Sequence, residues 1–180
     1  MMPLRALLLV YWLLTGCQSS PPKQVAAAPP VKLEPKRATL GEHQVEAPAA
    51  VWARYRCASA RRLPVAALEE QQLWPQPVAA GSQLTHQFAY ALCPAKPAGA
   101  VAGTLYRKIY FQGRLVHSGR QPFTLKPGRW EVNAIIKVPQ ESAAGTYTLR
   151  TEFIGRAARK RKIKLMESTD FEVIAARPGP

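Results

Sequence analysis

The feature that most restricts the fold of this chain is an alternation of apolar and polar side chains in steps of two, which recurs along its second half. It is clearest in LTHQFAYAL (84–92), RWEVNAIIKV (129–138) and GTYTLRTEF (145–153). Successive side chains of a strand point to opposite sides of the sheet. The period therefore predicts strands that each have one buried face.

Other segments extend this pattern. TLYRKIYFQGRLVHSG (104–119) predicts two strands that turn at Gln112-Gly113, and VWARYRC (51–57) predicts the first strand of the domain. KIKLMES (162–168) and TDFEVIAA (169–176) predict a closing pair of strands. Short strands separated by glycine and proline turns indicate a β-sandwich.

One segment has a different pattern. PVAALEEQQLW (64–74) is compatible with a short helix, because Pro64 suits a helix start and Pro75 stops it. No predicted strand is followed by a long helical crossover, so a parallel α/β fold is disfavoured.

The segment WEVNAIIKVPQESAAGTYTLRTEF (130–153) resembles the penultimate hairpin of bacterial immunoglobulin-like domains. In that family one strand ends in Val-Pro, here Val138-Pro139, and the next begins Gly-x-Tyr-x-Leu, here residues 145–149. The resemblance implies that Tyr147 packs its ring while its hydroxyl reaches backbone, as in a tyrosine corner. The expected fold is all-β: a single antiparallel immunoglobulin-like β-sandwich of about seven to eight strands over residues 51–177.

The beginning of the chain has a signal-like pattern. Arg5 precedes an apolar run, Ala6 to Leu14, that is far shorter than the roughly 20 residues of a membrane-spanning helix. Leu14-Thr15-Gly16-Cys17 then resembles the lipobox of bacterial lipoproteins. The resemblance implies that residues 1–16 are a signal peptide and that Cys17 is lipidated and anchors the protein to a membrane. An ordinary signal peptide that contains a cysteine is the alternative.

Residues 17–50 are rich in proline and alanine and have no sustained apolar period. They are expected to form a disordered, semi-extended tether between the lipid and the domain. In the lipoprotein family, an aspartate after the cysteine is associated with retention in the inner membrane. Gln18 stands there instead. The expected location is the cell outer membrane, with the domain facing the periplasm.

If Cys17 carries lipid, Cys57 and Cys93 remain in an oxidising compartment, where a disulfide between them is expected. The alternative is a pair of free or metal-binding thiols. Their wide spacing, without a CxxC motif or paired histidines, disfavours a metal site.

The chain is strongly basic, with a formal net charge of +14 from 25 basic and 11 acidic residues. Such a surface favours anionic partners, among them lipid head groups, lipopolysaccharide phosphates, acidic glycans and acidic proteins. Nucleic acid matches the charge but is discounted as a partner for an exported lipoprotein.

The basic residues are densest in GRAARKRKIKL (155–165). The anion-binding candidates there are Arg156, Arg159, Lys160, Arg161, Lys162 and Lys164. Arginines in such a group offer bidentate contacts to phosphate. The alternative is a solvated hairpin whose lysines protect an edge strand. Further cations whose placement the sequence does not define are Arg107, Lys108, Arg114, Arg120 and Arg129.

Few residues are available for catalysis. Asp170 is the single aspartate, and no HExxH, GxSxG or Walker-type motif is present. His43 lies in the tether, His86 falls on an alternating face as a core or edge residue, and His117 adjoins a turn. No catalytic residue, metal or cofactor is therefore expected, and the protein is not expected to be an enzyme.

The sequence thus predicts a non-catalytic, lipid-anchored envelope protein whose domain acts as an interaction or assembly module. One alternative is binding of anionic envelope polymers, lipopolysaccharide or peptidoglycan, through the basic hairpin. Another is a small accessory lipoprotein of a secretion system. An enzyme is the least favoured, and would need a cleft that joins His86 to a buried glutamate.

Overall fold

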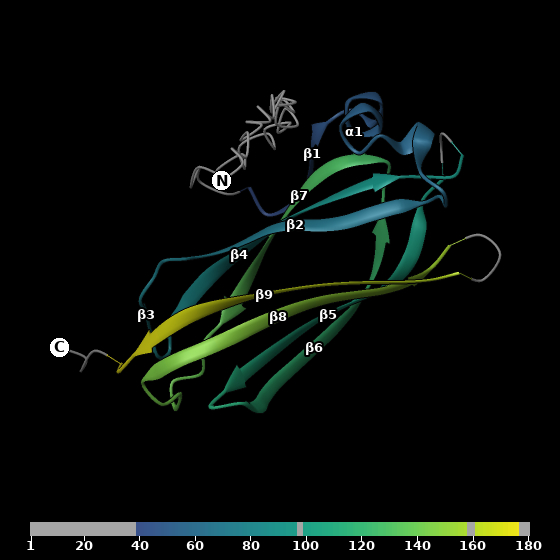
Figure 1. The fold of residues 1–180 in the computed structure, drawn as a ribbon. Coiled ribbons are helices and arrows are strands. Elements are labelled where there is room, and N and C mark those ends of the chain that lie inside the picture. The colour runs from purple at the N-terminus through teal and green to yellow at the C-terminus, as the bar shows by residue number, and fades with distance from the viewer. Residues whose placement is uncertain (1–38, 97–98, 158–160, 177–180) are drawn as a thin grey trace, which may run out of the picture. The chain divides into compact units, whose positions relative to one another are not determined.

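In the computed structural model, which describes residues 39–96, 99–157 and 161–176, the chain forms two β-sheets and very little helix. In chain order the elements are β1 (Gly41–Glu46), α1 (Pro48–Arg54), the 3-10 helix η1 (Cys57–Ser59), β2 (Val65–Trp74), β3 (Val78–Ala79), β4 (Gln83–Cys93), β5 (Val101–Phe111), β6 (Arg114–Leu125), β7 (Gly128–Lys137), β8 (Gly145–Arg156) and β9 (Lys162–Ile174). A four-stranded sheet has the order β1-β7-β4-β2, and a five-stranded sheet has the order β3-β9-β8-β5-β6. Figure 1 shows the two sheets as separate layers. The expected all-β class is confirmed.

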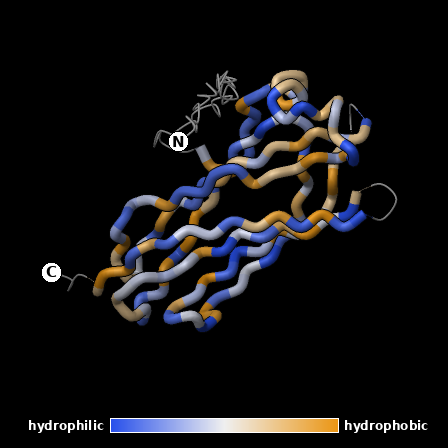
Figure 2. Tube along the Cα trace, viewed as in Figure 1, coloured by the Kyte–Doolittle hydropathy of each residue, from blue (hydrophilic) through white to orange (hydrophobic). Residues whose placement is uncertain are grey.

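The core lies between the sheets and is built from both inner faces. At one end it contains Leu84 of β4 with Leu149 and Phe171 of the five-stranded sheet. At the other end Phe88 packs with Phe153. Figure 2 shows the hydropathy alternating along the strands that supply these residues. Each fully buried Leu or Phe contributes about 1.5–3 kcal/mol to folding.

The strands expected from alternation are confirmed at 84–92 in β4, at 129–137 in β7 and at 145–153 in β8. The hairpin of β5 and β6 turns where expected. Gln112 and Gly113 both have positive φ, 49° and 75°. Two such residues form the type I′ turn whose twist matches that of paired strands.

Two early segments differ from the prediction. The expected strand at 51–57 is instead the end of α1 followed by η1, because Pro48 opens a helical turn and Val51 is buried against Ala91 of β4. The expected helix at 64–74 is β2, which pairs with β4 throughout. A bulge between Leu68 and Glu70 shifts its period, so its apolar spacing resembles that of a helix face.

The ends of the domain also differ. β1 lies inside the 17–50 stretch predicted as linker, where it pairs with β7 as a largely exposed edge strand. The closing pair predicted at 162–176 is one strand, β9, because its 13 residues lack a turn and pair with β8 continuously. With the two-residue β3, the described residues contain nine strands rather than seven to eight.

The predicted disulfide is confirmed: Cys57 and Cys93 are joined, with their Cα atoms 6.3 Å apart. The bond fixes η1 to the end of β4. It lies in a small apolar cluster on the outer face of the four-stranded sheet, where Val51 and Trp52 of α1 pack. The predicted signal peptide (1–16) and Cys17 lie outside the described residues.

Candidate functional site

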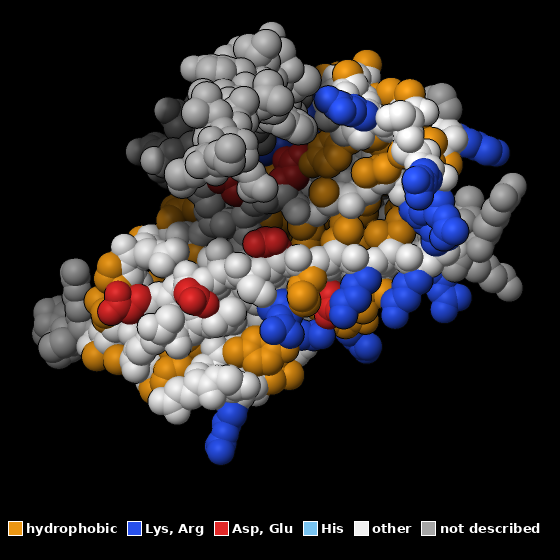
Figure 3. Space-filling view, in the orientation of Figure 1, with side chains coloured by type: hydrophobic (Ala, Val, Ile, Leu, Met, Phe, Trp, Pro, Cys, Tyr) orange, Lys and Arg blue, Asp and Glu red, His pale blue; other side chains and the backbone are white. Residues whose placement is uncertain are grey.

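The outer face of the five-stranded sheet carries a group of outward-pointing cations, which we call the basic face. Its members are Lys108 of β5, Arg120 of β6, Arg150 and Arg156 of β8, and Lys162 and Lys164 of β9. Inward residues alternate with them, for example Leu149 with Arg150 and Ile163 with Lys164. Figure 3 shows Lys and Arg side chains gathered below the front strands, with hydrophobic side chains among them.

Strand register places like charges directly opposite one another on this face. Lys108 faces Arg150 across β5 and β8, and Arg156 faces Lys162 across β8 and β9. Directly opposed like charges destabilise a sheet. Glu152 bonds to Lys108 in the first pair, so the larger repulsion lies between Arg156 and Lys162.

One carboxylate lies among these cations, that of Glu152. Lys108 donates to its Oε2 at 2.7 Å and Lys164 lies 2.9 Å from its Oε1. The hydrogen bond from Lys108, and then the one from Lys164, hold the pKa of Glu152 below its ordinary value. The carboxylate is therefore ionised at neutral pH. The other outward carboxylates of β9, Asp170 and Glu172, lie toward the opposite end of the strand.

Aromatic rings line the same face. The Nζ atom of Lys108 lies 5.3 Å from the ring centroid of Tyr106, and the guanidinium of Arg150 lies 4.9 Å from that of Tyr110. These cation–π contacts position the two cations without neutralising them. Met166 is also outward and 51% exposed.

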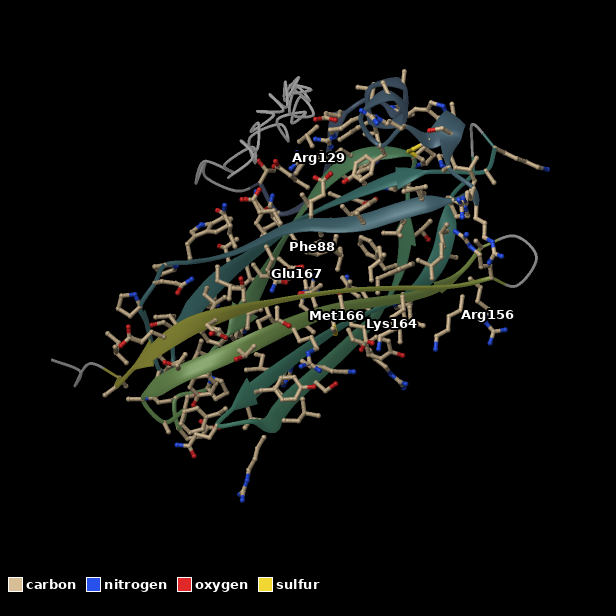
Figure 4. The ribbon with its side chains drawn as sticks, in the orientation of Figure 1. Phe88, Arg129, Arg156, Lys164, Met166 and Glu167 are labelled. Atoms are coloured by element: carbon tan, nitrogen blue, oxygen red, sulfur yellow. A yellow bond between two sulfur atoms is a disulfide. The ribbon has the colours of Figure 1, made fainter. Side chains whose placement is uncertain are left out.

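The structure brings together three of the six anion-binding candidates: Arg156, Lys162 and Lys164. In Figure 4, Arg156 and Lys164 point away from the layer that contains Arg129, whereas Phe88 lies between the layers. Arg161 is separate, because its guanidinium donates to the backbone carbonyl of Pro64. Arg159 and Lys160 lie outside the described residues.

Among the cations of undefined placement, Lys108 and Arg120 join the basic face and the others do not. Arg107 points inward, Arg114 adjoins the β5–β6 turn, and Arg129 lies on the other sheet, where it pairs with Glu69. Arg150 also belongs to the basic face, but it was not among the cations predicted from the sequence. The alternation of Tyr147 and Leu149 was the signal that would have placed it outward.

A second polar group lies in the core between the sheets, around His86, which is fully buried. Arg107 Nε donates to His86 Nδ1 at 3.1 Å, so Nε2 carries the proton and donates to Gln71 Oε1 at 3.0 Å. The Thr151 hydroxyl also donates to Gln71. Burial, and then the charge of Arg107, lowers the pKa of His86 to about 3. The ring is neutral and fully enclosed, which makes it a structural element of the core.

No group of three or more His, Cys, Asp and Glu side chains that could hold a metal ion occurs in residues 39–96, 99–157 and 161–176. Neither helix of this part of the chain is long and apolar enough to cross a membrane.

No protein-family model matches the chain, and no curated protein does. Among solved structures, it is similar to the sporulation control protein Spo0M from Bacillus subtilis, with 14% identity and a TM-score of 0.43. That match covers 63% of this chain and 51% of Spo0M. It is also similar to the Pseudomonas fluorescens alkylpurine DNA glycosylase AlkC bound to DNA containing an abasic site analog, with 11% identity and a TM-score of 0.41. That match covers 61% of this chain and 30% of AlkC. Likenesses at this level carry no functional argument.

Proposed function

We propose that this protein is a non-catalytic, lipid-anchored protein of the cell envelope whose domain binds anionic envelope polymers through the basic face. The observation that carries the proposal is the strand register that places Arg156 directly opposite Lys162, on the same outer face as Arg150 and Lys164. An anion between such cations relieves their repulsion and gains charge-assisted hydrogen bonds. Phosphate groups of lipopolysaccharide and acidic groups of peptidoglycan have this chemistry.

The envelope location is supported by the lipobox at Cys17 and by the Cys57–Cys93 disulfide, which suits an oxidising compartment. Mass spectrometry of the native product tests the anchor. We expect a chain that begins at Cys17 and carries acyl groups. A chain with residues 1–16 still attached, or with Cys17 unmodified, contradicts the anchor.

We also propose that the two-sheet domain is immunoglobulin-like. The Tyr147 hydroxyl donates to the backbone carbonyl of Ala143, four residues upstream, at 2.9 Å. This bond has the form of the tyrosine corner found in such domains. Because that architecture hosts many activities, the functional proposal depends on the basic face and not on the fold.

Binding to purified lipopolysaccharide and to peptidoglycan sacculi tests the proposed function. We expect the double variant Arg156→Glu/Lys162→Glu to bind roughly tenfold more weakly or worse, because four units of favourable charge are lost. The matched control is Arg56→Glu/Lys96→Glu, an equal charge change at exposed positions away from this face. Wild-type binding is expected to weaken as salt rises, since the screening length falls from about 10 Å at 0.1 M to about 3 Å at 1 M. Equal binding by both double variants would refute the proposal.

A further inference from the structure

Strand β6 has one free edge. Among the residues that the structure describes, it is the last strand of its sheet and pairs only with β5. Most of its residues are exposed, including Leu115 at 52% and Val116 at 54%. The backbone groups on a free edge are available to another extended chain. Pro122 has no N–H to donate, and the β5–β6 register shifts between Leu115 and His117, so residues 117–121 form the regular part of this edge.

An apolar cavity of about 420 Å³ adjoins this part of β6. Val116 and His117 of β6 form one side, and Ile136 of β7 and Val138, which follows that strand, form the other. Its volume falls within the roughly 300–1,000 Å³ typical of ligand sites. Because β1 pairs with β7 only over Arg129–Asn133, the cavity lies between two strands that both have a free edge there.

Aromatic rings form a firm wall of this cavity. The centroids of Phe111 and Tyr147 are 4.5 Å apart, and those of Tyr147 and Phe171 are 5.5 Å apart. The rings are stacked, and the Tyr147 hydroxyl is bonded to Ala143 rather than directed into the space. The wall is therefore preformed and apolar, which suits an aliphatic or aromatic side chain.

Charge indicates the kind of chain that fits the edge. Residues 114–121 include Arg114 and Arg120 and no acid, and Lys137 lies across the cavity, with Glu141 as the acid of its lining. A second copy of β6 would bring the same arginines against these, which disfavours self-pairing. An acidic segment has complementary charge.

We propose that β6 and the adjoining cavity bind an extended acidic segment of a partner protein, which adds a strand to β6 and places one apolar side chain in the cavity. In this mode, backbone hydrogen bonds supply affinity and the pocket supplies specificity. The inference rests on the proposed role as an interaction module, and it adds a second surface and a second class of partner.

A panel of synthetic peptides and the full-length protein test this. The parent peptide alternates Thr and Val, has Asp at both ends and carries one Leu at its centre. We expect it to bind roughly tenfold more tightly than the same peptide with Ser for Leu, because the anchor is buried. Replacing its Asp residues by Lys is expected to abolish binding to wild-type protein and to restore it with Arg114→Glu.

The matched protein variants are Val116→Asn and Met166→Asn. The two residues have similar exposure, 54% and 51%, but only Val116 lines the cavity. We expect Val116→Asn to weaken binding of the Leu peptide roughly tenfold, and Met166→Asn to leave that binding unchanged. Thermal unfolding of both variants shows whether each one still folds. Binding of the Lys peptide to Arg114→Glu gives a second result that an unfolded protein could not produce.

The proposal is overturned if no peptide of the panel binds, or if Ser and Leu peptides bind equally. It is also overturned if dodecanoate occupies the cavity while no peptide does, since the occupant is then an acyl chain. The Arg156→Glu/Lys162→Glu variant is expected to keep the preference for Leu over Ser. A failure of the polymer-binding proposal is therefore distinguishable from a failure of the peptide-binding proposal.

Discussion

His86 lies between the two sheets without exposed surface, and its two ring nitrogens are bonded to Arg107 and Gln71. Its pKa is lowered from 6.5 to about 3, first by burial and then by Arg107. A histidine in the unfolded chain takes up a proton below its ordinary pKa, whereas the folded ring does not. Its contribution to stability is therefore fully present above pH 6.5 and is lost as pH falls toward 3.

This predicts that the free energy of unfolding decreases between about pH 6.5 and pH 5, by up to about 1.4 kcal/mol per pH unit. Urea unfolding at a series of pH values measures it. The variant His86→Gln, which cannot titrate, should show a flatter profile over the same range. Parallel profiles for the two proteins would contradict the account of His86.

Side-chain direction was predictable for some residues and not for others. Alternation along β8 and β9 assigns Arg156, Lys162 and Lys164 to the outer face, and the structure agrees. The contacts of Arg161 and Arg107 could not be predicted from alternation, because each long side chain reaches a partner on a distant strand or loop. Pro64 and His86 are those partners, and nothing in the local pattern indicates them.

At the scale of elements, the pairing of β5 with β8 depends on two small residues. Gly103 lies directly opposite Gly155, and a Cβ at Gly103 would come within 2.4 Å of the Ile154 carbonyl oxygen. We expect Gly103→Ala to destabilise the protein by about 1–3 kcal/mol, the usual cost of overpacking. The control is Gly119→Ala on β6, where the nearest atom would be 3.6 Å away. Equal melting temperatures for the two variants would exclude this role for Gly103.

The disulfide holds α1 and η1 against the end of β4. It closes a loop with a sequence separation of 36 residues between Cys57 and Cys93. Replacing both cysteines by alanine should lower the free energy of unfolding by about 4 kcal/mol on the chain-entropy estimate. Urea unfolding with and without reductant measures this. A wild-type protein that is insensitive to reductant would be inconsistent with the prediction.

The sequence predicted β4, β7 and β8 well because each shows a sustained period of two, and it placed the β5–β6 hairpin by its turn at Gln112-Gly113. It failed at β2, where the bulge after Leu68 breaks that period, and at α1, where Pro48 and its neighbours form a single short helix. It also failed at β1, which buries little and is held mainly by pairing with β7. Such an edge strand has no apolar signal to detect.

For the whole molecule, the net charge of +14 predicted an anionic partner but not the surface that meets it. The basic face combines residues from four strands of one sheet, and its cross-strand pairs depend on register. Lys108 and Arg150 are 42 positions apart in the sequence and become neighbours only because β5 pairs with β8. Local patterning in the sequence identified Arg156, Lys162 and Lys164. The other members of the basic face join them only through the pairing of distant strands.

Hydroxyl-radical footprinting of the full-length protein with lipopolysaccharide tests the central claim most directly. Met166 and Tyr110 report on the basic face, and Ile135, 42% exposed on the outer side of the other sheet, is the internal control. We predict that lipopolysaccharide slows oxidation of Met166 and Tyr110 severalfold, that Ile135 is unaffected, and that high salt reverses the protection. Protection of Ile135 with Met166 still freely oxidised would place the contact on the opposite sheet and contradict the account.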